Sequence, residues 1–267
     1  MLRVGYYQFK PTFGKTAKNL EKVLKALREV DADLIVLPEL AFSGYYFRDR
    51  EETKSLSEDP RYSPTLDSLI ALCRERDFYL VTGFAEKARD KVFNSAALIG
   101  PEGIVHVYRK LHLFNEEKSW FDPGDIPLQV HEIKGAKIGM MICFDWIFPE
   151  VMRILTIQGA ELICHPSNLV LDYCQQTMLS RCIENLVFAI TTNRFGEDKR
   201  PHGRLRFTGK SQIVAPKGIL LRRAPSQREK LFVTQIDPRL ARDKNITPLN
   251  QIVTDRRTEF YAPISRS

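Results

Sequence analysis

The sequence predicts a layered α/β protein that forms one domain over residues 1–267, and three observations support this class. Apolar runs of strand length alternate with segments of helical periodicity along the chain. Two strand-like segments flank a glycine-rich turn at residues 100–103, as in an inserted β-hairpin. The 43% of hydrophobic residues suffices for a large core, and no low-complexity stretch or clear Pro/Gly/Ser-rich linker divides the 267 residues.

The first part of the chain predicts two helices and several strands. Leu20, Val23 and Leu27 recur at helical spacing, which indicates a helix over residues 16–30. Pro64 suits the first turn of a second helix over residues 64–76. Strands are expected at residues 2–9, 34–37, 78–83, 92–98 and 104–108.

The second part of the chain continues the alternation. An apolar run predicts a strand over residues 136–143 that ends at Cys143. Pro149 then opens a helix that reaches Gln158 and is capped by Gly159. A further helix is expected at residues 175–185, a turn at 216–218, and strands at 161–164, 186–192, 209–214 and 231–236.

The charge balance is basic, with a formal net charge of +7 and a pI near 9.1. Acidic residues are interspersed among the basic ones and no nucleic-acid-binding motif is recognisable, so we expect no nucleic-acid partner. The densest basic segment, Lys199 to Arg206, includes Arg200 and Arg204. We expect a solvated loop there; the alternative is that it borders an active site and attracts an anionic substrate.

The ends and the cysteines indicate a cytoplasmic protein without a membrane span. The N-terminus lacks a basic region followed by an apolar run, and no apolar segment is long enough to cross a bilayer. The five cysteines are odd in number and none are spaced as CxxC, which argues against a disulfide framework or a zinc ribbon.

Two charged residues stand at positions where packing alone would not place them. Glu39 follows a buried strand and Pro38; in a dry pocket its raised pKa would suit a general base, whereas the alternative is an exposed or capping glutamate. Lys110 follows the hairpin within residues 108–113. It could stabilise a developing oxyanion, or it could belong to a basic surface stretch.

A third candidate is Cys143, in residues 138–150, where the predicted strand ends and a helix soon begins. A strand–turn–helix unit projects a side chain into a pocket beside free backbone N–H groups, which suits an activated thiolate. The alternative is a buried, inert cysteine. That alternative is favoured for the cysteines without such surroundings, namely Cys73, Cys164, Cys174 and Cys182.

Together these segments resemble one family. Leu37-Pro38-Glu39, residues 108–113 (YRKLHL) and residues 143–150 (CFDWIFPE), in this order and spacing, resemble the three motif segments of the nitrilase superfamily of carbon–nitrogen hydrolases. The resemblance covers nearly the whole chain, because further family-like segments occur at residues 93–96, 121–125, 159–162, 182–185 and 209–211.

This resemblance implies a four-layer α-β-β-α sandwich with Glu39 as general base, Lys110 as triad lysine and Cys143 as nucleophile. It also implies a homodimer or larger homo-oligomer, and neither a metal nor an organic cofactor. Many family members are similar in carrying a second pocket glutamate before an aromatic residue. Glu117 fits that position better than Glu116, and the alternative is an exposed loop glutamate.

The implied reaction is hydrolysis of a small amide through a thioester on Cys143, with Lys110 and the backbone N–H of Phe144 stabilising the oxyanion. The same triad can attack a nitrile. True nitrilases of the superfamily usually have Trp-Glu after the cysteine, whereas Phe144-Asp145 follows here, which looks more like the amidase and carbamoylase branches. An acyltransferase that uses an amine instead of water, and a non-catalytic homologue, are further alternatives; the intact triad speaks against the latter.

Several residues could contact the substrate. Tyr45, in the aromatic run 45–47, and Trp146 could line the pocket, with core packing as the alternative. Asn168 could hydrogen-bond the substrate from a strand end, whereas His165 is expected to be structural. The sequence offers no arginine that we can assign to bind a carboxylate of the substrate. The sequence therefore leaves an ω-amide, an N-carbamoyl compound and an uncharged aliphatic amide open.

Overall fold

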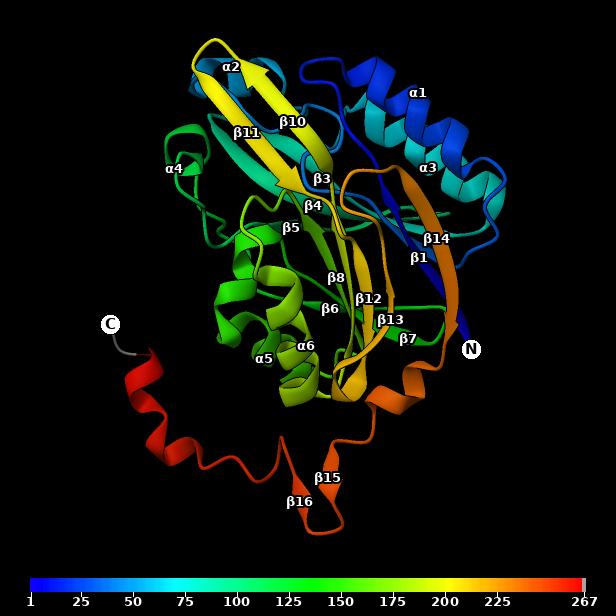
Figure 1. The fold of residues 1–267 in the computed structure, drawn as a ribbon, viewed down its shortest axis with the longest axis vertical. Coiled ribbons are helices and arrows are strands. Elements are labelled where there is room, and N and C mark those ends of the chain that lie inside the picture. Colours follow the sequence, from blue (N-terminus) through cyan, green and yellow to red (C-terminus); the bar gives the residue numbers. More distant parts are fainter. Residues whose placement is uncertain (266–267) are drawn as a thin grey trace.

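Two sheets lie face to face between outer layers of helices, as the computed structural model of the protein shows (Figure 1). The structure describes residues 1–265, and within this range each of the two main sheets has six strands. This is the single-domain α-β-β-α sandwich that the sequence predicts.

The first sheet has the order β14-β1-β2-β3-β4-β5. Its strands β1, β2 and β3 run parallel, whereas β4 and β5 form the antiparallel hairpin expected around residues 100–103. β14 returns late in the sequence to pair antiparallel with β1. The bounds are β1 Leu2–Gln8, β2 Leu34–Val36, β3 Tyr79–Ala88, β4 Lys91–Gly100, β5 Gly103–Arg109 and β14 Lys230–Ile236.

The second sheet has the order β13-β12-β9-β8-β7-β6, again with a parallel centre, here β7, β8 and β9. Antiparallel strands complete it on both sides. The edge strands β6 and β13 are absent from the sequence-based expectations. The bounds are β6 Val130–Ile133, β7 Ala136–Met140, β8 Leu162–Ser167, β9 Phe188–Asn193, β12 Gln212–Ala215 and β13 Ile219–Arg223.

Four helices cover the outer faces of the two sheets (Figure 1). α1 (Thr16–Leu27) and α3 (Pro64–Arg76) pack on the first sheet, and α5 (Pro149–Ile157) and α6 (Cys174–Asn185) pack on the second. The start of α3 agrees with the sequence because the Ser63 side chain accepts a hydrogen bond from the third helical N–H.

The core between the sheets explains why the central strands are continuous apolar runs. Tyr6 and Val36 of the first sheet belong to the same buried cluster as Ile138 and Leu162 of the second. The opposite faces of the first-sheet strands pack against α1 and α3. Strands buried on both faces do not alternate between apolar and polar residues.

Smaller elements surround the sandwich. A hairpin of β10 and β11 lies over α2 at one end, and the C-terminal segment extends beyond α5 and α6 (Figure 1). No helix among the described residues is long and apolar enough to cross a bilayer. The bounds are α2 Arg50–Ser55, α4 Glu117–Trp120, β10 Phe195–Arg200, β11 Gly203–Thr208, β15 Asn245–Thr247 and β16 Asn250–Gln251; 3-10 turns span Cys143–Ile147, Pro216–Gly218, Pro238–Ala241, Thr258–Phe260 and Ala262–Ser265.

Two expectations are wrong in detail. β7 ends at Met140, and Cys143 begins a 3-10 helix instead of ending the strand. The strand stops before Cys143 because the Ile142 N–H donates to the Asp145 side chain instead of to a neighbouring strand. The basic segment is a β-hairpin instead of a loop. Arg200 is held there by an ion pair with Glu52.

Candidate active site

Lys110 lies fully buried between two carboxylates that are also fully buried. Its Nζ is 2.7 Å from Oε1 of Glu39 and 2.8 Å from Oε1 of Glu117. Lys110 directly follows β5, Glu39 follows β2 after two residues, and Glu117 begins α4. The fold therefore brings together three charged residues that lie far apart in the sequence.

Neighbouring strands hold Glu39 in place. The side-chain amide of Asn94, on β4, donates to Glu39 Oε1 over 2.7 Å. The backbone carbonyl of Asn94 accepts from the Lys110 backbone N–H over 2.8 Å. A Cβ atom at Gly83 of β3 would come within 2.4 Å of the Glu39 Cα, so glycine is required for this close approach. Asn94 lies in a family-like segment, but sequence reasoning assigned it no role.

Glu117, and not Glu116, is the buried glutamate of its segment; Glu116 is exposed. The Tyr45 hydroxyl donates to Glu117 Oε1 over 2.7 Å, and the Phe114 backbone N–H donates to Oε2 over 3.1 Å. Tyr45 thus contacts the glutamate next to Lys110, and it does not line the cavity at the cysteine described below.

Cys143 is nearly buried and has a φ of 41°, a left-handed conformation that is uncommon for a residue with a side chain. His165 Nε2 donates to the Cys143 carbonyl over 2.9 Å, while its Nδ1 lies 3.1 Å from the Thr191 hydroxyl. Burial lowers the pKa of His165 to about 4, so this ring is neutral near pH 7. His165 has the structural position that the sequence analysis expected.

Asp145 connects the cysteine turn to the lysine segment. This buried carboxylate accepts hydrogen bonds from the Tyr108 hydroxyl, from the backbone N–H of Ile142, and from the backbone and Nδ1 of His112. Sequence reasoning used Asp145 only to distinguish branches of the superfamily. Its side chain contacts these residues and does not line the cavity at Cys143, whereas Phe144 does.

The buried charges influence one another. Burial raises the pKa of Glu39, and Lys110 partly opposes this effect. Burial also raises the pKa of the Cys143 thiol, as does Glu39, while Lys110 again opposes. For Lys110, burial would lower the pKa, but the charges of Glu117 and Glu39 prevail and raise it. At neutral pH the lysine is therefore a cation and the resting cysteine is a thiol.

A cavity of about 20 Å³ adjoins the Cys143 side chain, and its walls are mostly apolar. Asn168, which is 2% exposed, contributes a polar group to it and donates from its side chain to the Glu39 carbonyl over 2.9 Å. The sequence-predicted Phe144, Trp146 and Asn168 thus meet at one cavity, together with Phe114, Leu169, Val170 and Leu171.

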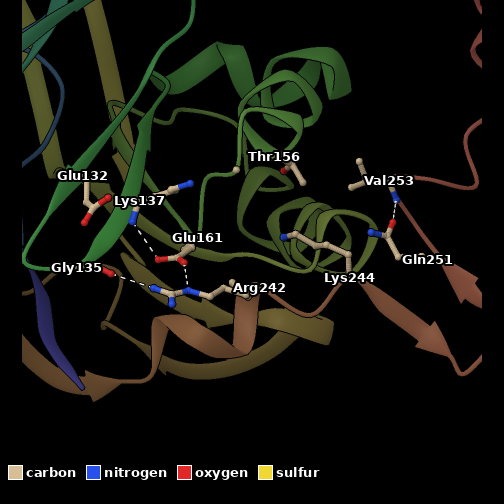
Figure 2. A pocket seen from close by; sticks show the side chains of 11 residues that line it. Glu132, Gly135, Lys137, Thr156, Glu161, Arg242, Lys244, Gln251 and Val253 are labelled. Atoms are coloured by element: carbon tan, nitrogen blue, oxygen red, sulfur yellow. Dashed lines mark hydrogen bonds and ion pairs between the residues drawn. The ribbon is translucent and has the colours of Figure 1, made fainter.

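A larger cavity of about 650 Å³ lies elsewhere, between β7, the start of β8 and the C-terminal segment (Figure 2). None of the candidate active-site residues lines it. Arg242 is paired there with Glu161, and Lys244 donates to the last carbonyls of α6. Within residues 1–265, no group of three or more His, Cys, Asp or Glu side chains is arranged to hold a metal ion.

The sandwich and the buried charged residues beyond its strand ends point to a hydrolase class, and comparison with known proteins gives the family. The model of the carbon-nitrogen hydrolase family matches residues 3–245. The chain therefore belongs to the carbon–nitrogen hydrolases of the nitrilase superfamily.

Curated relatives carry several activity names. The chain is 41% identical over 264 residues to a nitrilase of Pyrococcus abyssi, covering 98% of this chain and 99% of that protein. It is 35% identical to an (R)-stereoselective amidase of a Pseudomonas species, covering 82% and 80% of the two chains. It is 29% identical to an N-carbamoylputrescine amidase of Arabidopsis thaliana, covering 90% and 87%.

Solved structures share the fold. A carbon-nitrogen hydrolase from Helicobacter pylori G27 superposes with a TM-score of 0.89 at 25% identity, covering 99% of this chain and 98% of that one. An amidase from Nesterenkonia superposes with a TM-score of 0.80 at 24% identity, covering 98% and 96%, which supports the fold alone.

Proposed function

We propose that the protein hydrolyses the carbon–nitrogen bond of a small amide or N-carbamoyl compound through a thioester on Cys143. The observation that carries this proposal is the buried contact between Lys110 and Glu39, whose charges both act on the Cys143 thiol. A nucleophile, a proton acceptor and a fixed cation next to one another are what acyl transfer from an amide requires.

Glu39 has a free atom for the first proton transfer. Its Oε1 accepts from Lys110 and Asn94, whereas Oε2 has no hydrogen-bond partner among residues 1–265. Glu39 takes the thiol proton while the sulfur attacks the amide carbon. Burial raises the pKa of Glu39 above its usual value, which makes the carboxylate a stronger proton acceptor.

The negative charge that develops on the amide oxygen needs hydrogen-bond donors. Two of the three N–H bonds of Lys110 are directed at Glu39 and Glu117, which leaves one for this oxygen. The backbone N–H of Phe144 is the second donor in the proposal. Glu117, itself held by Tyr45, orients the lysine.

The intermediate then collapses. The carbon–nitrogen bond breaks, Glu39 returns the proton to the leaving nitrogen, and ammonia departs from a primary amide. Water adds to the remaining thioester with Glu39 accepting its proton, the carbon–sulfur bond breaks, and the acid leaves with the thiol restored.

A second candidate is hydrolysis of a small nitrile to the acid and ammonia. The Pyrococcus abyssi relative that shares 41% identity is called a nitrilase, which favours this reaction. The same thiol would add to the nitrile carbon and form a thioimidate, which water would then convert to the thioester.

The test is ammonia release from a panel of small amides, N-carbamoyl compounds and nitriles. We expect release from amides or carbamoyl compounds, and its loss in Cys143→Ala. Cys73→Ala is the matched control, because Cys73 lies on the buried face of α3, in a different core cluster from Cys143. An active Cys143→Ala enzyme would refute the mechanism, and release from nitriles alone would select the second candidate.

We further propose a cytoplasmic homodimer or larger homo-oligomer. All five cysteines lie unpaired in the described chain, as a reducing compartment favours. Exposed apolar side chains on and near α5 support self-association, among them Ile147, Ile154 and Ile157. Light scattering on purified protein should give at least twice 30.8 kDa, and a monomer mass would contradict the assembly. Cell fractionation tests the compartment.

A further inference from the structure

Asn168 carries a buried acceptor that the protein leaves unused. Several buried polar atoms lack a hydrogen-bond partner among residues 1–265, and Asn168 Oδ1 is the one that belongs to a residue lining the cavity at Cys143. Leaving such a group unpaired is unfavourable, so a buried orphan acceptor at a cavity indicates where a ligand supplies a donor.

The orientation of this side chain is determined by its surroundings. The Asn168 side-chain nitrogen donates to the Glu39 carbonyl over 2.9 Å, which assigns the other terminal atom as the oxygen. Asn168 and Cys143 also line the same cavity. The Asn168 side chain is therefore held by the Glu39 backbone and lies beside the thiol where the amide would react.

The rest of the cavity offers no charge to a substrate. Apart from Asn168, Cys143 and the indole N–H of Trp146, the lining side chains are apolar, and none of the lining residues is Lys, Arg, Asp or Glu. A charged group entering these walls would lose its hydration without a partner. The enclosed space is about 20 Å³, close to a single water site, so its walls must move apart to admit even a small acyl group.

We propose that Asn168 Oδ1 accepts an N–H of the scissile amide, so that the site selects small, uncharged primary amides over nitriles with the same acyl group. This rests on the function proposed above. A primary amide has two N–H donors, one for Asn168 Oδ1 and one for the unpaired Glu39 Oε2, whereas a nitrile has none. Sites built to hydrogen-bond a substrate N–H discriminate strongly against analogues that lack it.

The experiment compares propionamide with propionitrile in the wild type and in Asn168→Leu, which has a similar size and no acceptor. Asn168→Leu also removes the hydrogen bond to the Glu39 backbone, so both reactions should slow. We expect kcat/KM to fall roughly tenfold to hundredfold more for the amide than for the nitrile, as for one further hydrogen bond lost in a buried site. Val170→Ala is the matched control on the same wall, and it should change both substrates by the same factor. A purely structural role of Asn168 predicts equal losses, which would overturn the proposal.

Binding without turnover provides a second readout. Propionamide and propionitrile are titrated into Cys143→Ala and into Cys143→Ala/Asn168→Leu, and dissociation constants are measured by NMR. We expect weaker propionamide binding to the double variant and unchanged propionitrile binding; equal effects on both ligands would overturn the role of Asn168. An active Cys143→Ala enzyme would instead contradict the proposed function, so the two failures are distinguishable.

Discussion

The hydroxyl of Tyr108 donates a hydrogen bond to Oδ2 of Asp145 over 2.7 Å, and this contact joins β5 of the first sheet to the 3-10 helix of Cys143 beside the candidate active site. Tyr108 lies on β5, two residues before Lys110, and Asp145 lies two residues after Cys143. The relative position of the lysine and the cysteine is therefore set by a buried polar contact as well as by the apolar core.

Replacing Tyr108 with Phe should weaken this connection. The variant removes one hydrogen bond to a buried carboxylate, which typically contributes about 1.5–3 kcal/mol. We expect the free energy of unfolding in urea to fall by about that amount and kcat to fall more than KM rises. Tyr62→Phe is the control, because Tyr62 is 76% exposed and should be neutral. Unchanged stability in Tyr108→Phe would contradict the prediction.

Lys110→Met should be strongly destabilising as well as inactive. It leaves the buried carboxylates of Glu39 and Glu117 without their cation, a situation that typically costs about 3–5 kcal/mol. Adding Glu117→Gln to Lys110→Met removes one uncompensated charge, so the double variant should unfold at a higher urea concentration than Lys110→Met. Additive effects of the two substitutions would argue against this electrostatic coupling.

A stacked pair of histidines should make the fold sensitive to acid. The rings of His106 on β5 and His131 on β6 lie 4.4 Å apart, and burial followed by the charge of its neighbour lowers the pKa of His106 to about 4. Burial also lowers the pKa of His131. At a pH between about 4 and 6.5 these histidines are protonated in the unfolded chain but neutral in the folded protein. The free energy of unfolding therefore falls as the pH decreases from about 6.5 toward 4.

The measurement is the melting temperature against pH for the wild type and for His106→Phe/His131→Phe. The double variant should lose less stability between neutral pH and pH 4, because it removes two groups that charge on unfolding. Since other groups also titrate in this range, the comparison uses the difference between the two curves. Parallel curves would exclude the histidine pair as a source of acid sensitivity.

Trp146→Ala should widen the range of acyl groups. Trp146 forms part of the small cavity at Cys143, and truncation of a wall makes room for larger or branched chains. We expect kcat/KM for a branched amide to rise relative to propionamide. Ile147→Ala, at an exposed neighbour, should leave this ratio unchanged, and a constant ratio in Trp146→Ala would remove Trp146 from the acyl pocket.

The basic hairpin should not attract anionic substrates. Arg200 pairs with Glu52, and Arg204 and Lys199 both lie near Glu197, so much of the positive charge is locally balanced. We expect KM to stay nearly constant between low and high ionic strength. A KM for an anionic amide that rises steeply with salt would restore electrostatic attraction as a function of this segment.

Elements with local signals were predictable from the sequence. The helix over Pro64–Arg76 was predicted correctly because residues at its own ends determine where it begins and stops. Ser63 and Pro64 mark its start, and Asp77 marks its end. The hairpin of β4 and β5 was also predicted correctly, because its turn lies between two clear apolar strands. The edge strands β6 and β13 are short, and β13 is largely exposed, so no core periodicity marks them.

Within the candidate site, the motifs indicated which residues to examine, but the sequence did not indicate their conformations. The motifs named Glu39, Lys110 and Cys143, and the structure brings Glu39 and Lys110 into direct contact. The left-handed turn at Cys143 depends on Asp145 and His165, whose partners lie far away in sequence. Asn94 could have been considered from its family-like segment, but its two contacts appear only once β3, β4 and β5 are paired.

The way the first sheet closes has a consequence during protein synthesis. Glu39 and Lys110 leave the ribosome well before Cys143, and β14, the last strand of their sheet, spans residues 230–236. A growing chain that lacks β14 exposes one edge of β1 and cannot complete the layer that holds Glu39 and Lys110. We therefore expect the thiol to remain an ordinary, unreactive cysteine on the nascent chain until nearly the whole polypeptide has been translated.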